Sequence, residues 1–135
     1  MVNALFSIKP SYAKEILCGS KRVEYRKKRC KQEIGRIFIY ATKPIAAIVG
    51  EVTVVGILSQ PPSVLWESTQ ECSGISKEAF FQYFEGCPTA YAYQLKCAIE
   101  YKKPIPLRTV GISTPPQSYC YLSENQVAAI LCGSM

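Results

Sequence analysis

The sequence predicts an α+β fold, a small mixed β-barrel flanked by helices. Two observations favour it. Five or six strand-like runs rich in β-branched and aromatic residues recur along the chain, and the helical segments between them are too few for a doubly wound sheet. Pro104 and Pro106 lie inside one run and confine it to an edge. A length of 135 residues and a hydrophobic content of 48% predict one domain over residues 1–135.

The elements follow one another without repeats or linkers. Ala4–Ile8 predicts a short strand, and a helix over Ser11–Cys18 follows it, with Gly19 as its C-terminal stop. Further strands are predicted at residues 36–41, 47–58, 91–95, 97–107 and 119–122. Further helices are predicted at 63–71, from residue 76 to a Gly-Cys-Pro stop, and from a capping box that begins at Ser123 to Gly133.

Residues 19–29 join a glycine turn to a strand-like stretch with alternating polar side chains. The polar positions share one face of such a strand: Arg22, Glu24, Arg26 and Lys28. A carboxylate held among cations on one face can act as a recognition unit. This segment is therefore the first candidate for a functional site.

Positive charge is concentrated near the N-terminus. The net charge is +6, and residues 1–43 carry eleven Lys or Arg against three Glu, whereas residues 44–135 carry five against seven. Clustered cations suit phosphates and other anions, because neutralising a polyanion releases counterions. A solvated basic face is the structural alternative.

The composition excludes several kinds of chemistry. The chain has no histidine and no aspartate, which excludes His-based triads, His-ligated metals and paired-Asp catalysis. Its seven cysteines include no Cys-x-x-Cys pair, so neither a disulfide framework nor a zinc site is indicated, and we expect no metal and no cofactor. Free cysteines, an N-terminus without a signal-peptide profile and the lack of a membrane-length apolar run predict a cytoplasmic protein with no membrane contact.

The segment 7–26 resembles the ASCH domain, a member of the PUA-like superfamily. It carries the pattern Gly-x-Lys-x-x-Glu-x-Arg after a strand and a helix, at Gly19, Lys21, Glu24 and Arg26. Weaker similarity continues at residues 39–44, 48–50 and 115–119. The resemblance implies a PUA-like mixed β-barrel of five to seven strands with a cleft beside the first helix.

Family members are thought to bind RNA, and some resemble small enzymes. In the acetylcytidine amidohydrolases the signature Lys, a Thr three residues later and a Glu from a later helix are the proposed catalytic set. These positions correspond to Lys21, Glu24 and Glu78, so a carboxylate replaces the hydroxyl here. Other members resemble weak ribonucleases that use a Tyr, a Lys and a Ser, which fall at Tyr40, near Lys43 and at Ser118.

The functional hypothesis is a basic cleft that binds RNA or a nucleotide-like ligand. The candidate binding residues are Lys9, Lys21, Glu24, Arg26, Tyr40 and Lys43. The first alternative is a metal-independent hydrolase, amidohydrolase or ribonuclease, with Lys21, Glu24, Glu78 and Ser118 as candidate catalytic residues. The second alternative is a regulatory adaptor that binds a protein partner. Each residue also has a structural alternative: a turn lysine for Lys21, and a cross-strand ion pair for Glu24 with Arg26.

Overall fold

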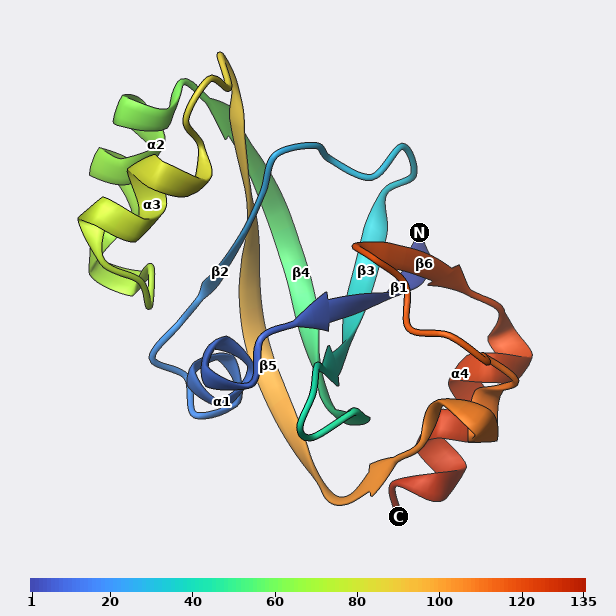
Figure 1. Ribbon diagram of the computed structural model, residues 1–135. Helices are drawn as coiled ribbons and strands as arrows, with labels where there is room; N and C mark the ends of the chain where they lie inside the picture. The colour runs from blue at the N-terminus through green and yellow to red at the C-terminus, as the bar shows by residue number, and fades with distance from the viewer.

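The computed structural model describes residues 1–135 as a six-stranded mixed sheet with four α-helices. The predicted α+β class is therefore confirmed (Figure 1). The strands are β1 Val2–Ile8, β2 Val23–Arg26, β3 Ile34–Ala41, β4 Ala47–Gln60, β5 Ala90–Ile105 and β6 Tyr119–Leu122. The helices are α1 Pro10–Leu17, α2 Pro62–Thr69, α3 Lys77–Tyr83 and α4 Glu124–Gly133, with 3₁₀ turns at Gln70–Cys72 and Leu107–Val110.

The strand order is β2-β5-β4-β3-β1-β6. Only β1 and β3 are parallel, and the other pairs are antiparallel. The long strands β4 and β5 pair through three register irregularities, which favour strong local twist. The sheet is not closed, because its edge strands β2 and β6 do not pair with each other. It is a flattened, barrel-like sheet that keeps an open seam.

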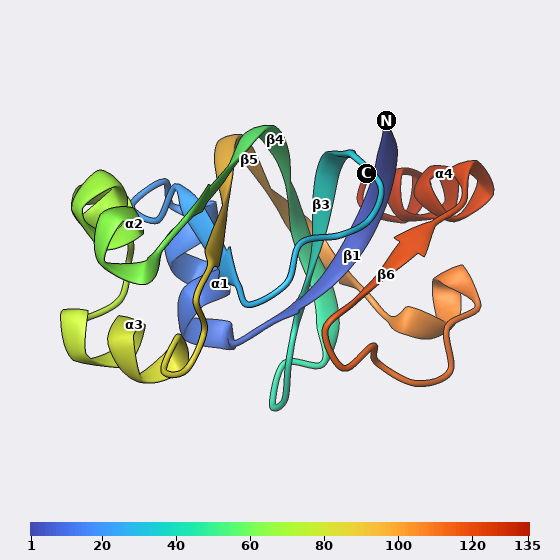
Figure 2. The same ribbon diagram turned by 90° about the horizontal axis from the view of Figure 1, so that it is seen from above.

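Side chains alternate between the two faces of the sheet. From β1 and β3, Phe6 and Ile39 face a core cluster that α1 completes with Ala13 and Ile16. The opposite face of these strands packs under α4 and the 3₁₀ turn that follows β5. A third cluster joins α2 and α3 to β2 and the start of β5. Figure 2 shows α2 and α3 on one side of the sheet and α4 on the other.

Local signals in the sequence place most element ends. Gly19 adopts a left-handed conformation, φ 89°, directly after α1. The predicted capping box at Ser123 is present, because its hydroxyl accepts from the backbone N–H of Gln126 and the Gln126 side chain accepts from the N–H of Ser123.

Two predicted strands, 91–95 and 97–107, form the single strand β5. A residue with positive φ, Cys97 at 56°, marks the junction where a break was expected. Before this point β5 pairs with both β2 and β4, and after it only with β4. β5 is therefore an interior strand and not the predicted edge strand, but Pro104 lies in its last part, where one side is unpaired and no N–H is needed, and Pro106 lies just beyond its end. None of the helices is long and apolar enough to cross a membrane.

We expect Gly50→Ala to destabilise the protein by about 1–3 kcal/mol, the usual range for overpacking. A Cβ at Gly50 in β4 would overlap the carbonyl oxygen of Ile99 and the side chain of Leu17. Gly35→Ala is the matched control, since its nearest neighbour would be Met1 Cβ at 3.4 Å, an ordinary contact. Urea unfolding of both variants measures the difference. Equal stability of the two variants would contradict the close approach of β4 and β5.

Candidate functional site

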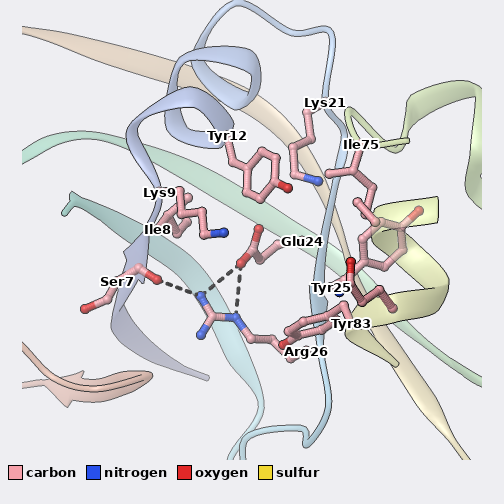
Figure 3. Close-up of a pocket in the computed structure, with 12 residues that line it drawn as sticks. Ser7, Ile8, Lys9, Tyr12, Lys21, Glu24, Tyr25, Arg26, Ile75 and Tyr83 are labelled. Atoms are coloured by element: carbon pink, nitrogen blue, oxygen red, sulfur yellow. Dashed lines mark hydrogen bonds and ion pairs between the residues drawn. The ribbon is translucent and has the colours of Figure 1, made fainter. Parts of the chain in front are cut away.

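A pocket of about 400 Å³ opens between the end of β1, the start of α1, the segment that leads into β2, and α3. Most of its polar lining comes from residues 7–26 and the opposite wall from α3 and the loop before it (Figure 3). The ionisable side chains of its lining are three cations and one carboxylate besides tyrosines: Lys9, Lys21, Arg26 and Glu24. The predicted candidate motif therefore forms one wall of a real cavity.

Lys21 reaches the pocket from the turn after α1. Its stem passes directly over Gly74, where a Cβ would lie 2.8 Å from the Lys21 side chain. The ammonium group donates to the carbonyl oxygen of Ser73 and lies 5.1 Å and 5.0 Å from the ring centres of Tyr12 and Tyr25. Because a lysine carries three donors, the bond to Ser73 leaves N–H groups for a ligand.

The Lys21 side chain is 2% exposed. Burial lowers the pKa of Lys21 from its ordinary 10.5, while the nearby carboxylates of Glu24 and Glu15 act in the opposite direction. The ammonium group is thus desolvated but remains beside a negative charge. It is a stronger acid and a stronger electrostatic partner than a lysine in water.

Arg26 crosses the seam of the sheet. Its Nε donates to Glu24 Oε2, and Nη2 forms an ion pair with the same oxygen and donates to the carbonyl oxygen of Ser7 at the end of β1. Its Nη1 donates to Oγ and to the carbonyl oxygen of Ser118, just before β6. The guanidinium also lies 4.6 Å from the ring centre of Phe6. The N–H groups of the guanidinium are therefore used in contacts with the protein, and Arg26 holds Glu24 and the neighbouring strands in place.

Glu24 is 7% exposed and is held in one orientation by Arg26. Only its Oε2 contacts Arg26: it accepts a hydrogen bond from Nε at 3.1 Å and lies 2.9 Å from Nη2 in an ion pair. Its Oε1 therefore remains an acceptor for a ligand in the pocket. The side chain points between Lys9, Tyr12 and Lys21 in Figure 3.

Three tyrosines form the aromatic walls. Tyr25 is structural: its hydroxyl pairs with that of Thr69, and burial raises its pKa to about 12. Tyr12 lies under the ammonium groups of Lys9 and Lys21, at 5.8 Å and 5.1 Å from its ring centre. Tyr83, at the end of α3, is 39% exposed. Both Tyr12 and Tyr83 line the pocket.

The pocket brings together four of the predicted residues: Lys9, Lys21, Glu24 and Arg26. Other predicted residues lie elsewhere. Tyr40 is buried on the α4 side of the sheet, opposite Ser7 in the β1–β3 register. Lys43 is exposed in the turn after β3, and Glu78 is exposed in the first turn of α3. Ser118 lies outside the lining but is linked to it through Arg26. The roles given to these residues stay predictions.

The pocket wall that α3 forms was not predicted from the sequence. Helical spacing places Ala79, Phe80, Tyr83 and Phe84 on one side of α3, which favours a core face. Phe80 and Phe84 do enter the core, whereas Ala79 and Tyr83 line the pocket. The signal that separates them is the polar hydroxyl of Tyr83, which favours a position at the edge of a core. No group of three or more Cys or Glu side chains is placed to hold a metal ion.

Comparison with known proteins agrees with this architecture. The ASCH domain family model matches residues 6–109, and the chain belongs to this family. A Zymomonas mobilis protein named ASCH domain-containing ribonuclease is 27% identical over 138 residues, covering 95% of this chain and 89% of the relative.

Solved structures show the same fold. The crystal structure of ASCH from Zymomonas mobilis matches with a TM-score of 0.91 and 28% identity, over 98% of this chain and 96% of that one. The N-terminal domain of Staphylothermus marinus McrB matches with a TM-score of 0.63 and 15% identity, over 96% and 93% of the two chains. At that identity the second match concerns the fold alone.

The lowered pKa of Lys21 makes the stability of the protein depend on pH. The unfolded chain binds the Lys21 proton more tightly than the folded one, so this group adds stability as the pH rises through its folded pKa toward 10.5. We expect Lys21→Met to be at least as stable as the wild type at pH 7 and to lose this advantage as the pH approaches 10.5. Urea unfolding of both proteins across this range measures the difference. A stability difference that is constant with pH would contradict the burial of the ammonium group.

Proposed function

We propose that the protein binds RNA by holding one nucleotide in the pocket formed by Lys9, Tyr12, Lys21, Glu24 and Tyr83. The observation that carries the proposal is the desolvated Lys21 ammonium group beside a carboxylate with one free oxygen, in a pocket that tyrosine side chains line. The volume of about 400 Å³ lies within the range of small-molecule sites. The Zymomonas relative, which bears the name ribonuclease, supports RNA as the ligand class.

Each part of a nucleotide has a complementary group in this pocket. The exposed Lys9 and the free N–H groups of Lys21 suit a phosphate. Glu24 Oε1 suits an amino or imino N–H on the edge of a base. The ring of Tyr12 suits stacking, which is tolerant of base identity. Arg26 is assigned a positioning role, because its donors are already occupied.

Lys21→Ala is expected to weaken RNA binding by about 10- to 100-fold, since charge-assisted hydrogen bonds contribute about 1.5–3 kcal/mol. Lys14→Ala is the matched control: Lys14 is exposed on α1, outside the pocket lining, and its loss changes the net charge equally. Fluorescence anisotropy with a labelled single-stranded RNA, repeated at several salt concentrations, measures both variants. Salt-insensitive binding, or an equal effect of the two substitutions, would sink the proposal.

RNA cleavage is a second candidate function, favoured by the arrangement of Glu24 and Lys21 and by the name of the Zymomonas relative. RNA supplies its own nucleophile, so an activated protein hydroxyl is not required. The ribose 2′-oxygen attacks the adjacent phosphorus, Glu24 Oε1 takes its proton, the bond to the 5′-oxygen breaks, and Lys21 protonates that oxygen. The products are a 2′,3′-cyclic phosphate and a 5′-hydroxyl. The amidohydrolase alternative has less support, because Glu24 replaces the required hydroxyl and Ser118 Oγ accepts from Arg26.

Glu24→Gln is expected to lower the rate of RNA cleavage by at least about 100-fold, the range for removal of a general base, and a strand that lacks the 2′-hydroxyl at the cleavage position should not be cut. The amide preserves the shape of the side chain and an acceptor for Arg26. Gel analysis of end-labelled RNA, beside a strand with one 2′-deoxyribose at the cleavage position, measures both points. Cleavage at the deoxyribose, or an undiminished rate in Glu24→Gln, would rule out this mechanism and leave the binding proposal intact.

A further inference from the structure

We propose that Tyr83 and the basic loop, residues 27–31, form a second subsite that binds the nucleotide next to the one in the pocket. The protein would then recognise a single-stranded RNA segment rather than a free nucleotide. This inference rests on the proposed function of the pocket. It is carried by three observations: unpaired charge, a fixed loop backbone, and an aromatic ring shared by the loop and the pocket.

The basic loop carries charge that the protein does not neutralise. It follows directly after β2, which supplies Glu24 and Arg26 to the pocket. Its four cations are all exposed: Lys27, Lys28, Arg29 and Lys31. The ion pairs of the protein are Arg26 with Glu24 and Arg36 with Glu51, so no carboxylate lies within 4.0 Å of these four groups. Neighbouring unpaired cations suit consecutive phosphates of a strand.

The backbone of the loop is fastened to the sheet. The buried Cys30 donates its N–H to the hydroxyl of Tyr93 on β5 at 2.8 Å. Gln32, just after the loop, donates its N–H to the hydroxyl of Tyr121 on β6 at 3.1 Å. A loop whose charged side chains only contact water would not need these two backbone hydrogen bonds. Fixing the backbone in advance reduces the entropy lost when a strand binds.

Tyr83 connects the loop to the pocket. Its ring lines the pocket, and the ammonium group of Lys27 lies 4.9 Å from its ring centre. The ring packs against Phe84, at a centroid distance of 4.8 Å, which fixes its orientation while leaving the residue 39% exposed. A base stacked on Tyr83 would therefore have its phosphate beside Lys27 and its neighbour in the pocket.

The test compares uridine monophosphate with hexauridylate RNA as ligands of the full chain, by calorimetry at several salt concentrations. One variant combines Lys28→Gln, Arg29→Gln and Lys31→Gln. The matched control combines Lys102→Gln, Lys103→Gln and Arg108→Gln, which removes the same residue types from exposed positions outside the pocket lining and the loop. Thermal unfolding checks that both triple variants remain folded.

The loop variant is expected to bind hexauridylate at least tenfold more weakly and uridine monophosphate within about twofold of the wild type. Its salt slope for hexauridylate should fall by about 2, since each single-strand phosphate contact contributes about 0.7. Tyr83→Leu should weaken hexauridylate binding by about tenfold, and Tyr83→Phe should retain it, because stacking needs the ring and not the hydroxyl.

Failure of the second subsite is distinguishable from failure of the pocket. If the wild type binds both ligands with equal affinity, or if the loop and control variants lose affinity equally, the second subsite is refuted and the pocket stands. If neither ligand binds, the proposed function itself fails. Strong binding of hexauridylate by Tyr83→Leu would refute the role of the ring.

Discussion

The guanidinium group of Arg26 holds together the part of the fold on which the site depends. The edge strands β2 and β6 do not pair, so backbone hydrogen bonds leave the sheet open. Arg26 on β2 bridges this seam through the carbonyl oxygen of Ser7 on β1 and both oxygens of Ser118 before β6. A lysine could not replace it, because only the planar five-donor group reaches these partners and Glu24 together.

This use of Arg26 determines which groups remain for a ligand. The side chain that fixes the orientation of Glu24 also neutralises one of its oxygens, and the other oxygen stays free. Lys9 and Lys21 then supply the cationic donors of the pocket. From its charge alone, Arg26 would be expected to bind the ligand. Its hydrogen bonds show that it binds other groups of the protein instead. This division supports the proposed phosphate site on Lys9 and Lys21, with an acceptor beside it.

Sequence reasoning succeeded where the cause of a feature is local. The left-handed turn at Gly19, the capping box at Ser123 and the alternation in β2 each depend on a few neighbouring residues, and these placed one wall of the pocket. Tyr40 illustrates the limit. Its orientation depends on the register of β3 and on which face of the sheet each alternate residue occupies, and these place its side chain on the α4 side. Tyr83 depends on how α3 packs against β2, a contact between segments far apart in the sequence.

The distribution of buried polar residues also sets the pocket apart from the rest of the fold. Five polar or charged residues are buried: Lys21, Glu24, Glu51, Thr69 and Ser73. Four of these belong to the pocket or its support, because Ser73 accepts from Lys21 and Thr69 holds Tyr25. Burying an ammonium group costs desolvation free energy, and a methionine would fill the same space without that cost. Apart from Glu51, the other buried residues are hydrophobic. Polar burial concentrated at one cavity therefore supports the proposed binding of a charged ligand.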